Sequence, residues 1–143
     1  SCYNKTMMQT HNRILLVEDE DLIGQALVDK LTREGFEVTW AKNGVSGLEQ
    51  TAALTPDLIL LDIIMPKMDG ITMLKKLQAD DHGCKIPIVV LTNLSDNRKV
   101  EEAMTSGAYD YLVKTEWTLE ELVAKMREVL SRVTLFSGHT HHS

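Results

Sequence analysis

Three carboxylates in this sequence stand directly after short apolar runs. Glu18 and Asp19 follow the run 13–17, and Asp62 follows the run 58–61. A short, unbroken apolar run is typical of a strand that is buried on both faces of a parallel sheet. Such strands present their carboxyl ends at one edge of the sheet, where ligands bind. We therefore expect the three carboxylates to meet there, joined by a cation such as Mg²⁺, which prefers oxygen ligands.

A hydroxyl and an amine are expected at the same edge. Thr92 ends the apolar run 86–91, and Lys114 ends the run 109–113. A threonine hydroxyl can donate to a phosphoryl oxygen, and a lysine can pair with that oxygen or with a carboxylate. The set fits phosphoryl transfer to an aspartate, because positioning and charge neutralisation do nearly all the work in that reaction. Asp62 is the candidate acceptor.

Each of these residues also has an ordinary structural interpretation. An acidic pair after a strand often caps a helix, and an aspartate such as Asp62 can cap a loop. Thr92 can bond the backbone at a strand end, and Lys114 can be a solvated surface amine. Four strand ends that carry complementary groups in this order nevertheless favour a site over coincidence.

Five strand-length segments alternate with five segments of helical periodicity. The expected strands are 13–17, 36–41, 58–61, 86–91 and 109–113, and the expected helices are 22–34, 44–54, 70–77, 95–106 and 118–133. This alternation predicts an α/β fold, with a parallel sheet covered by helices on both faces.

Length and composition favour one domain. The 143 residues, of which 43% are hydrophobic, suit a single core. We expect a flexible leader over 1–12, one domain over 13–133, and a flexible tail over 134–143 whose histidines are typical of an expression tag. Cys2 and Cys84 form no metal-binding pattern, so both are expected to be free thiols.

Charge and hydropathy argue against two kinds of partner. The net charge of −6 argues against direct binding of nucleic acid, because phosphate backbones are bound by clustered Lys and Arg. The longest apolar runs are strand-length, so no membrane span is expected. The first residues lack the apolar core of a signal peptide, which favours a cytoplasmic protein.

The chain resembles bacterial response regulator receiver domains in four stretches. They read Ile-Leu-Leu-Val-Glu-Asp-Glu at 14–20, Leu-Asp-Ile-Ile-Met-Pro-Lys-Met-Asp-Gly at 61–70, Val-Leu-Thr-Asn at 90–93 and Asp-Tyr-Leu-Val-Lys at 110–114. The resemblance covers nearly all of 13–132. It implies the flavodoxin-like (CheY-like) doubly wound sheet of five parallel strands in the order 2-1-3-4-5, with five helices.

The resemblance also implies roles for the acidic residues. Asp62 matches the phosphoacceptor of the family. Glu18 and Asp19 match the acidic pair that holds Mg²⁺ together with Asp62. The backbone carbonyl of Ile64 matches the remaining protein ligand of that ion.

Three further residues match the parts that grip the phosphoryl group and switch the domain. Thr92 matches the gripping hydroxyl, Lys114 the lysine that pairs with the phosphoryl group, and Tyr111 the aromatic switch residue. The implied protein takes a phosphoryl group from a sensor histidine kinase or a phosphotransfer protein onto Asp62. The surface formed by 95–131 then changes, and this surface contacts a downstream protein target. It catalyses only its own phosphorylation and dephosphorylation. A monomer or a weak, phosphorylation-dependent homodimer is expected.

The sequence departs from the family pattern at four positions. Thr115 follows Lys114 where the family usually has proline, so we expect a trans bond and a rearranged loop there. Tyr109 stands where many members carry aspartate, which removes a charge from the usual dimer face. Ile64 and Leu94 are apolar where other members are polar, which predicts a longer-lived phosphoryl group.

Two other functions are compatible with parts of the pattern. An aspartyl-phosphate phosphatase of the haloacid dehalogenase type needs a second acid two residues after the nucleophile, where this chain has Ile64. A flavin-binding, flavodoxin-like carrier needs a Ser/Thr-rich phosphate loop after the first strand, where the acidic stretch 18–21 would repel a phosphate. The residues favour the receiver over both.

Overall fold

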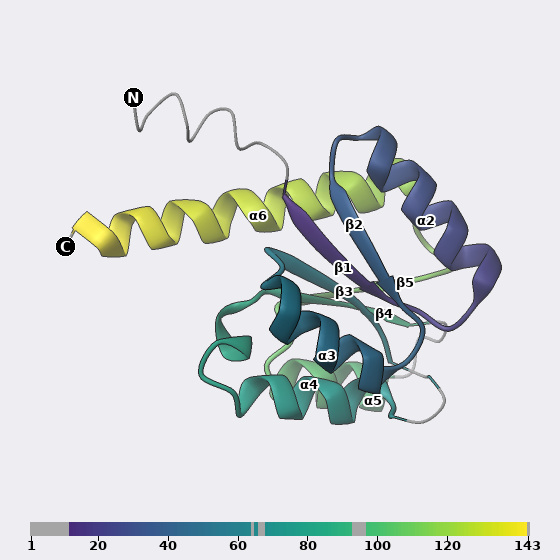
Figure 1. Cartoon of the computed structure of the whole chain (residues 1–143), viewed down its shortest axis with the longest axis horizontal. Coiled ribbons are helices and arrows are strands. Elements are labelled where there is room, and N and C mark those ends of the chain that lie inside the picture. The colour runs from purple at the N-terminus through teal and green to yellow at the C-terminus, as the bar shows by residue number, and fades with distance from the viewer. Residues whose placement is uncertain (1–11, 64, 66–67, 93–96, 143) are drawn as a thin grey trace.

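The computed structural model describes residues 12–63, 65, 68–92 and 97–142. Its elements are β1 (Arg13–Val17), α2 (Asp21–Arg33), β2 (Glu37–Ala41), α3 (Gly44–Leu54), β3 (Leu58–Asp62), α4 (Gly70–Gln78), η1 (Gly83–Lys85), β4 (Ile88–Thr92), α5 (Asn97–Thr105), β5 (Asp110–Val113) and α6 (Leu119–His142). The strands form one parallel sheet in the order β2-β1-β3-β4-β5 (Figure 1). The predicted fold class and strand order are confirmed.

Helices cover both faces of the sheet, with α3, α4 and α5 on one side and α2 and α6 on the other (Figure 1). On β1, Leu15 and Val17 pack into the core beneath α3, α4 and α5. Ile14 and Leu16 pack into the second core, beneath α2 and α6. All the residues of β3 and β4 are buried. A strand buried on both faces needs no polar alternation, which explains the unbroken apolar runs.

The strand register aligns the ends that carry the candidate residues. Val17 of β1 pairs with Leu61 of β3, so the next residue on each strand, Glu18 and Asp62 respectively, stands at the same level of the sheet. On β4 and β5, the Lys114 amide donates to the Thr92 carbonyl at 2.6 Å. Four strand ends therefore deliver their side chains to one edge of the sheet, as predicted.

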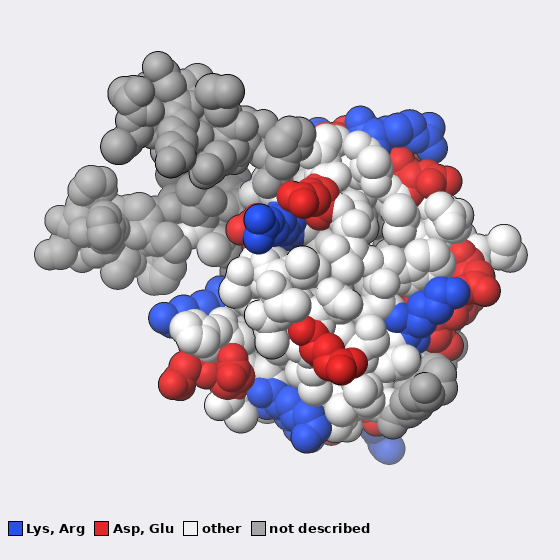
Figure 2. All heavy atoms as spheres, in the orientation of Figure 1, with Lys and Arg blue, Asp and Glu red and all other residues white. Residues whose placement is uncertain are grey.

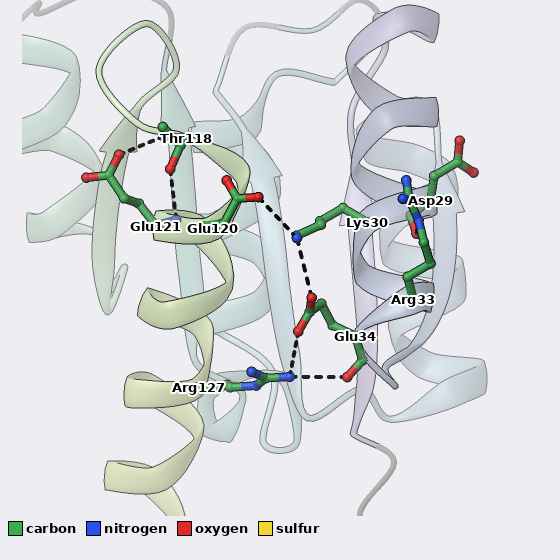
Figure 3. A network of polar contacts seen from close by, with 8 residues as sticks. All are labelled: Asp29, Lys30, Arg33, Glu34, Thr118, Glu120, Glu121 and Arg127. Carbon is green, nitrogen blue, oxygen red and sulfur yellow. Dashed lines mark hydrogen bonds and ion pairs between the residues drawn. The ribbon is translucent and has the colours of Figure 1, made fainter.

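A network of ion pairs joins the end of α2 to α6 (Figure 3). The Lys30 ammonium lies 3.3 Å from a Glu120 carboxylate oxygen and 3.4 Å from one of Glu34. The Arg127 guanidinium lies 3.0 Å from the Glu34 carboxylate. The hydrogen bond to Glu120 raises the pKa of Lys30 above its ordinary value. Ion pairs near the surface contribute little each, so the core, and not this network, supplies most of the stability.

Helix α6 is longer than predicted. A flexible tail was expected over 134–143, but the backbone of 134–142 continues the helix. This stretch contains no proline, and its one glycine weakens a helix without ending it. The domain boundary at 133 stays a prediction. The leader before Asn12, residue 143 and the predicted start of a helix at 95 lie outside the described residues.

The surface in Figure 2 carries both signs of charge, and no broad basic area lies on this face. This is in keeping with the net charge of −6. None of the helices in the described part of the chain combines the length and hydrophobicity needed to cross a bilayer. Cys84 is an exposed free thiol, as predicted, whereas Cys2 lies outside the described residues.

Candidate functional site

Asp62 ends β3 and is nearly buried, with 2% of its surface exposed. The backbone around it is closely packed, because a Cβ atom at Gly70 would lie 2.4 Å from the Asp62 carbonyl oxygen. Only glycine lets α4 begin this close to the end of β3. The Gly70 amide also donates to the Ile63 carbonyl at 2.7 Å. Ile63, the residue after Asp62, is thus held in place by Gly70, the first residue of α4.

Lys114 brings its ammonium into the middle of the carboxylates. It lies 2.7 Å from Glu18, 3.3 Å from Asp62 and 3.7 Å from Glu20, measured to the nearest carboxylate oxygens. The Lys114 side chain is 4% exposed and that of Glu18 is fully buried. Burial by itself lowers the pKa of Lys114, but the hydrogen bond to Glu18 and the charges of Asp62 and Glu18 outweigh it, so the pKa is raised. Lys114 therefore carries a positive charge beside Asp62 at neutral pH.

Three carboxylates come together at this edge of the sheet. Oxygens of Glu18, Glu20 and Asp62 all lie within 4.8 Å of one another. The sequence pattern pointed to Glu18 and Asp19 as the acidic pair and did not single out Glu20. The signal for Glu20 was its place in the same acidic stretch, but only the turn after β1 decides which of these side chains face Asp62.

Asp19 has a different environment from its neighbours. Its Oδ1 atom is buried and has no hydrogen-bond partner among the described residues. A buried, unpaired carboxylate oxygen is costly unless a cation or a donor occupies the space next to it. Asp19 therefore has the property expected of a metal ligand, although it lies outside the group of three.

The donor set fits Mg²⁺. Every group offered is a carboxylate oxygen, which is the ligand type that this hard ion prefers. Three carboxylates around one ammonium leave an excess of negative charge, and the orphaned oxygen of Asp19 adds to it. The predicted carbonyl ligand, that of Ile64, lies outside the described residues.

Thr92 and Tyr111 lie on the two neighbouring strands. Thr92 ends β4 and is 2% exposed. Tyr111 lies in the middle of β5, opposite Val90, and is 40% exposed. Thr92 is therefore buried at the site edge, while Tyr111 is partly exposed to solvent. Leu94 lies outside the described residues.

The bond after Lys114 is trans, as predicted, because no cis peptide bond occurs between described residues. The Glu116 amide donates to the Val113 carbonyl at 2.8 Å, which closes a turn around Lys114 and Thr115. The amine still reaches Asp62 without the proline that usually follows this lysine.

Comparisons with known proteins point to one family. Residues 14–127 match the family model of the response regulator receiver domain. The chain is 34% identical over 131 residues to the DNA-binding dual master transcriptional regulator RpaA of Synechocystis sp., covering 92% of this chain and 54% of that protein. It is 38% identical over 115 residues to the regulatory protein AtoC of Escherichia coli, covering 80% of this chain and 24% of that protein. The chain thus spans about half the length, or less, of these curated relatives.

Solved structures show the same likeness. A two-component response regulator from Clostridium difficile superposes with a TM-score of 0.79 at 30% identity, over 85% of this chain and 98% of that one. The chemotaxis response regulator CheY4 of Vibrio cholerae superposes with a TM-score of 0.78 at 29% identity, over 84% of this chain and 99% of that one.

Proposed function

Because this chain belongs to the response regulator receiver domain family of two-component systems, we propose that Asp62 is the residue on which it accepts a phosphoryl group. The domain is a phosphoacceptor signalling module and catalyses no reaction of a metabolite. The observation that supports Asp62 best is the Lys114 ammonium, 3.3 Å from its carboxylate inside a buried acidic cluster.

The proposed reaction is an in-line displacement at phosphorus. A carboxylate oxygen of Asp62 forms the new P–O bond while the bond from phosphorus to the donor's imidazole nitrogen breaks, and the imidazole leaves with the electron pair. Lys114 and the hydroxyl of Thr92 each donate to an oxygen of the transferred group. Since Glu18 and Asp62 raise the pKa of Lys114, it approaches the donor as an ammonium at neutral pH.

We assign the cation site to Glu18, Asp19 and Asp62, with Glu20 beside them and the Ile64 carbonyl as a further ligand. Bound Mg²⁺ would neutralise the charge that builds up on the phosphoryl oxygens. The orphaned oxygen of Asp19 and the all-carboxylate donor set support the assignment.

Phosphorylation is proposed to act on the output face, 95–131, by a shift of population. Thr92 would turn toward the phosphoryl group, and Tyr111, now 40% exposed, would turn into the space that Thr92 leaves. The surface presented to a downstream protein then changes.

The partners and the setting belong to the same proposal. The donor is a sensor histidine kinase or a phosphotransfer protein, and the transfer takes place in the cytoplasm. Residues 13–133 form the receiver, with 1–12 and 134–143 outside it; the family match over 14–127 supports this division. RpaA is described as DNA-binding, but for the domain described here we propose protein partners and no direct contact with nucleic acid.

Labelling with acetyl phosphate tests the proposal. The wild-type protein should gain one phosphoryl group in the presence of Mg²⁺ and none after the cation is chelated, as measured by intact mass. Asp62→Asn should abolish the gain. Asp81→Asn is the matched control, because Asp81 lies in the loop before η1 and away from the site edge, and it should be labelled normally. If the Asp62→Asn variant still gains the group, the acceptor is another residue.

A further inference from the structure

Both backbone polar atoms of Glu18 are held by β2, the neighbouring edge strand. The Glu18 amide donates to the Ala41 carbonyl at 3.0 Å. The indole N–H of Trp40 donates to the Glu18 carbonyl at 2.8 Å. The first bond continues the ladder between β1 and β2, whereas the second comes from a side chain. Trp40 therefore clamps the first residue of the acidic stretch.

Helix α2 leaves space for this indole. A Cβ atom at Gly24 would lie 2.0 Å from the Trp40 ring, so any side chain there would displace the ring. The Gly24 amide donates to the Glu20 carbonyl at 2.8 Å. Near the ring, the Lys42 ammonium lies 5.0 Å from its centroid and 2.7 Å from the Asp21 carboxylate. The ring is thus enclosed by the start of α2 and by Lys42 while its N–H points at the acidic stretch.

We infer that Trp40 is a positioning residue, which sets the affinity for a divalent cation by fixing the turn 18–20. The inference rests on the proposed cation site. Carboxylate oxygens of Glu18, Glu20 and Asp62 lie within 4.8 Å of one another, and Lys114 balances only part of their charge. The remaining repulsion favours movement of the turn away from β3. The two bonds from β2 oppose that movement. Ligands held in their binding arrangement lose less freedom when the ion binds, so the clamp favours binding.

The test compares two identical substitutions. Trp40→Phe keeps an aromatic ring and removes the N–H that holds Glu18. Trp117→Phe is the matched control, because the Trp117 indole nitrogen is buried and has no hydrogen-bond partner among the described residues. Calorimetric titration with Mg²⁺ should give a Kd raised about threefold to tenfold for Trp40→Phe, as expected for one lost hydrogen bond, and changed less than about twofold for the control.

A second readout separates positioning from chemistry. The Mg²⁺ concentration that gives half the maximal rate of acetyl phosphate labelling should rise in Trp40→Phe by the same factor as the Kd. The rate at saturating Mg²⁺ should equal that of the wild type, because Asp62, Thr92 and Lys114 are unchanged. A purely structural role for Trp40 would lower the melting temperature and leave the Kd unchanged, and this result would overturn the inference.

The inference can also be tested without altering Trp40. In ¹⁵N-labelled Trp117→Phe protein, Trp40 has the only indole N–H. Its exchange with solvent should be slow before any Mg²⁺ is added, as expected of an N–H that is hydrogen-bonded to the Glu18 carbonyl. Rapid exchange of this N–H in the folded protein would contradict the clamp even if Trp40→Phe failed to fold. A wild-type protein that binds no Mg²⁺ would instead refute the proposed cation site itself.

Discussion

The Lys114 ammonium lies 2.7 Å from Glu18, closer than it lies to Asp62, the proposed acceptor. The buried Glu18 carboxylate therefore holds the amine beside Asp62 before a phosphoryl group arrives. A phosphoryl oxygen bound to Asp62 would then meet a donor that is already in place. The charge balance of this cluster leads to the first two predictions.

Lys114→Met should destabilise the protein at neutral pH and slow labelling by acetyl phosphate. It leaves the buried carboxylates of Glu18 and Asp62 without their cation, a change that costs about 3–5 kcal/mol. Added Mg²⁺ should restore more stability to this variant than to the wild type, because the ion would replace the missing positive charge. Thermal unfolding with and without Mg²⁺ measures both effects.

Lys125→Met is the control for that experiment. Lys125 pairs with Asp110 at 2.8 Å on the output face, away from the acidic cluster. Loss of the Lys125 ammonium should lower the free energy of unfolding far less than Lys114→Met does. Added Mg²⁺ should stabilise this variant no more than it stabilises the wild type. An equal response in the two variants would contradict the proposed role of Lys114.

The raised pKa of Lys114 predicts how stability depends on alkaline pH. A lysine whose pKa is higher in the folded than in the unfolded protein stabilises the fold fully below its unfolded value, here 10.5. That stabilisation is lost as the pH rises through the folded value. Urea unfolding midpoints should therefore fall as the pH rises above 10.5, and the fall should be smaller in Lys114→Met, where this group is absent. The same fall in both proteins would assign it to other lysines.

Gly70→Ala should lower both stability and labelling. The new methyl group would lie 2.4 Å from the Asp62 carbonyl oxygen, so α4 or the end of β3 must move. Overpacking of this kind costs about 1–3 kcal/mol. Gly35→Ala is the comparison, because Gly35 has a φ of +98° with no atom near its missing Cβ. That change strains the backbone by about 1–2 kcal/mol and should leave labelling intact.

The output face predicts a monomer without phosphorylation and at most a weak dimer with it. Met104, Tyr109 and Tyr111 are exposed there, and Asp110 and Lys125 pair within one chain. Tyr109 and Val100 bring no charge to this face, and exposed ion pairs contribute only about 0–1 kcal/mol each. Light scattering at micromolar concentration, with and without beryllofluoride, measures the mass. A tight dimer of the unmodified protein would show that the apolar side chains themselves drive association.

The sequence by itself predicted the sheet and most of its edge. Unbroken apolar runs indicated strands covered on both faces, and the alternation with helices indicated a parallel sheet. Since parallel strands end at the same edge, Asp62, Thr92 and Lys114 could be placed together without coordinates. The resemblance of four short stretches to receiver domains then supplied the order of the strands.

Local patterns were less informative about the length of α6. The polar, histidine-rich composition of the tail indicates a loose segment, but adding a residue to a helix that has already formed costs less than starting a new one. The stretch after Val133 contains no proline, and the helix continues to His142.

Only the tertiary structure decided how the acidic stretch is arranged. Glu18, Asp19 and Glu20 are consecutive carboxylates, and their order does not reveal which of them face Asp62. The turn between β1 and α2 places Glu18 and Glu20 in one group with Asp62 and leaves an oxygen of Asp19 buried and unpaired. The Trp40 indole, which lies 22 residues further along the chain, donates to the Glu18 carbonyl at the start of that turn. Contacts between residues so far apart form only when the strands pair, because no local preference of the backbone encodes them.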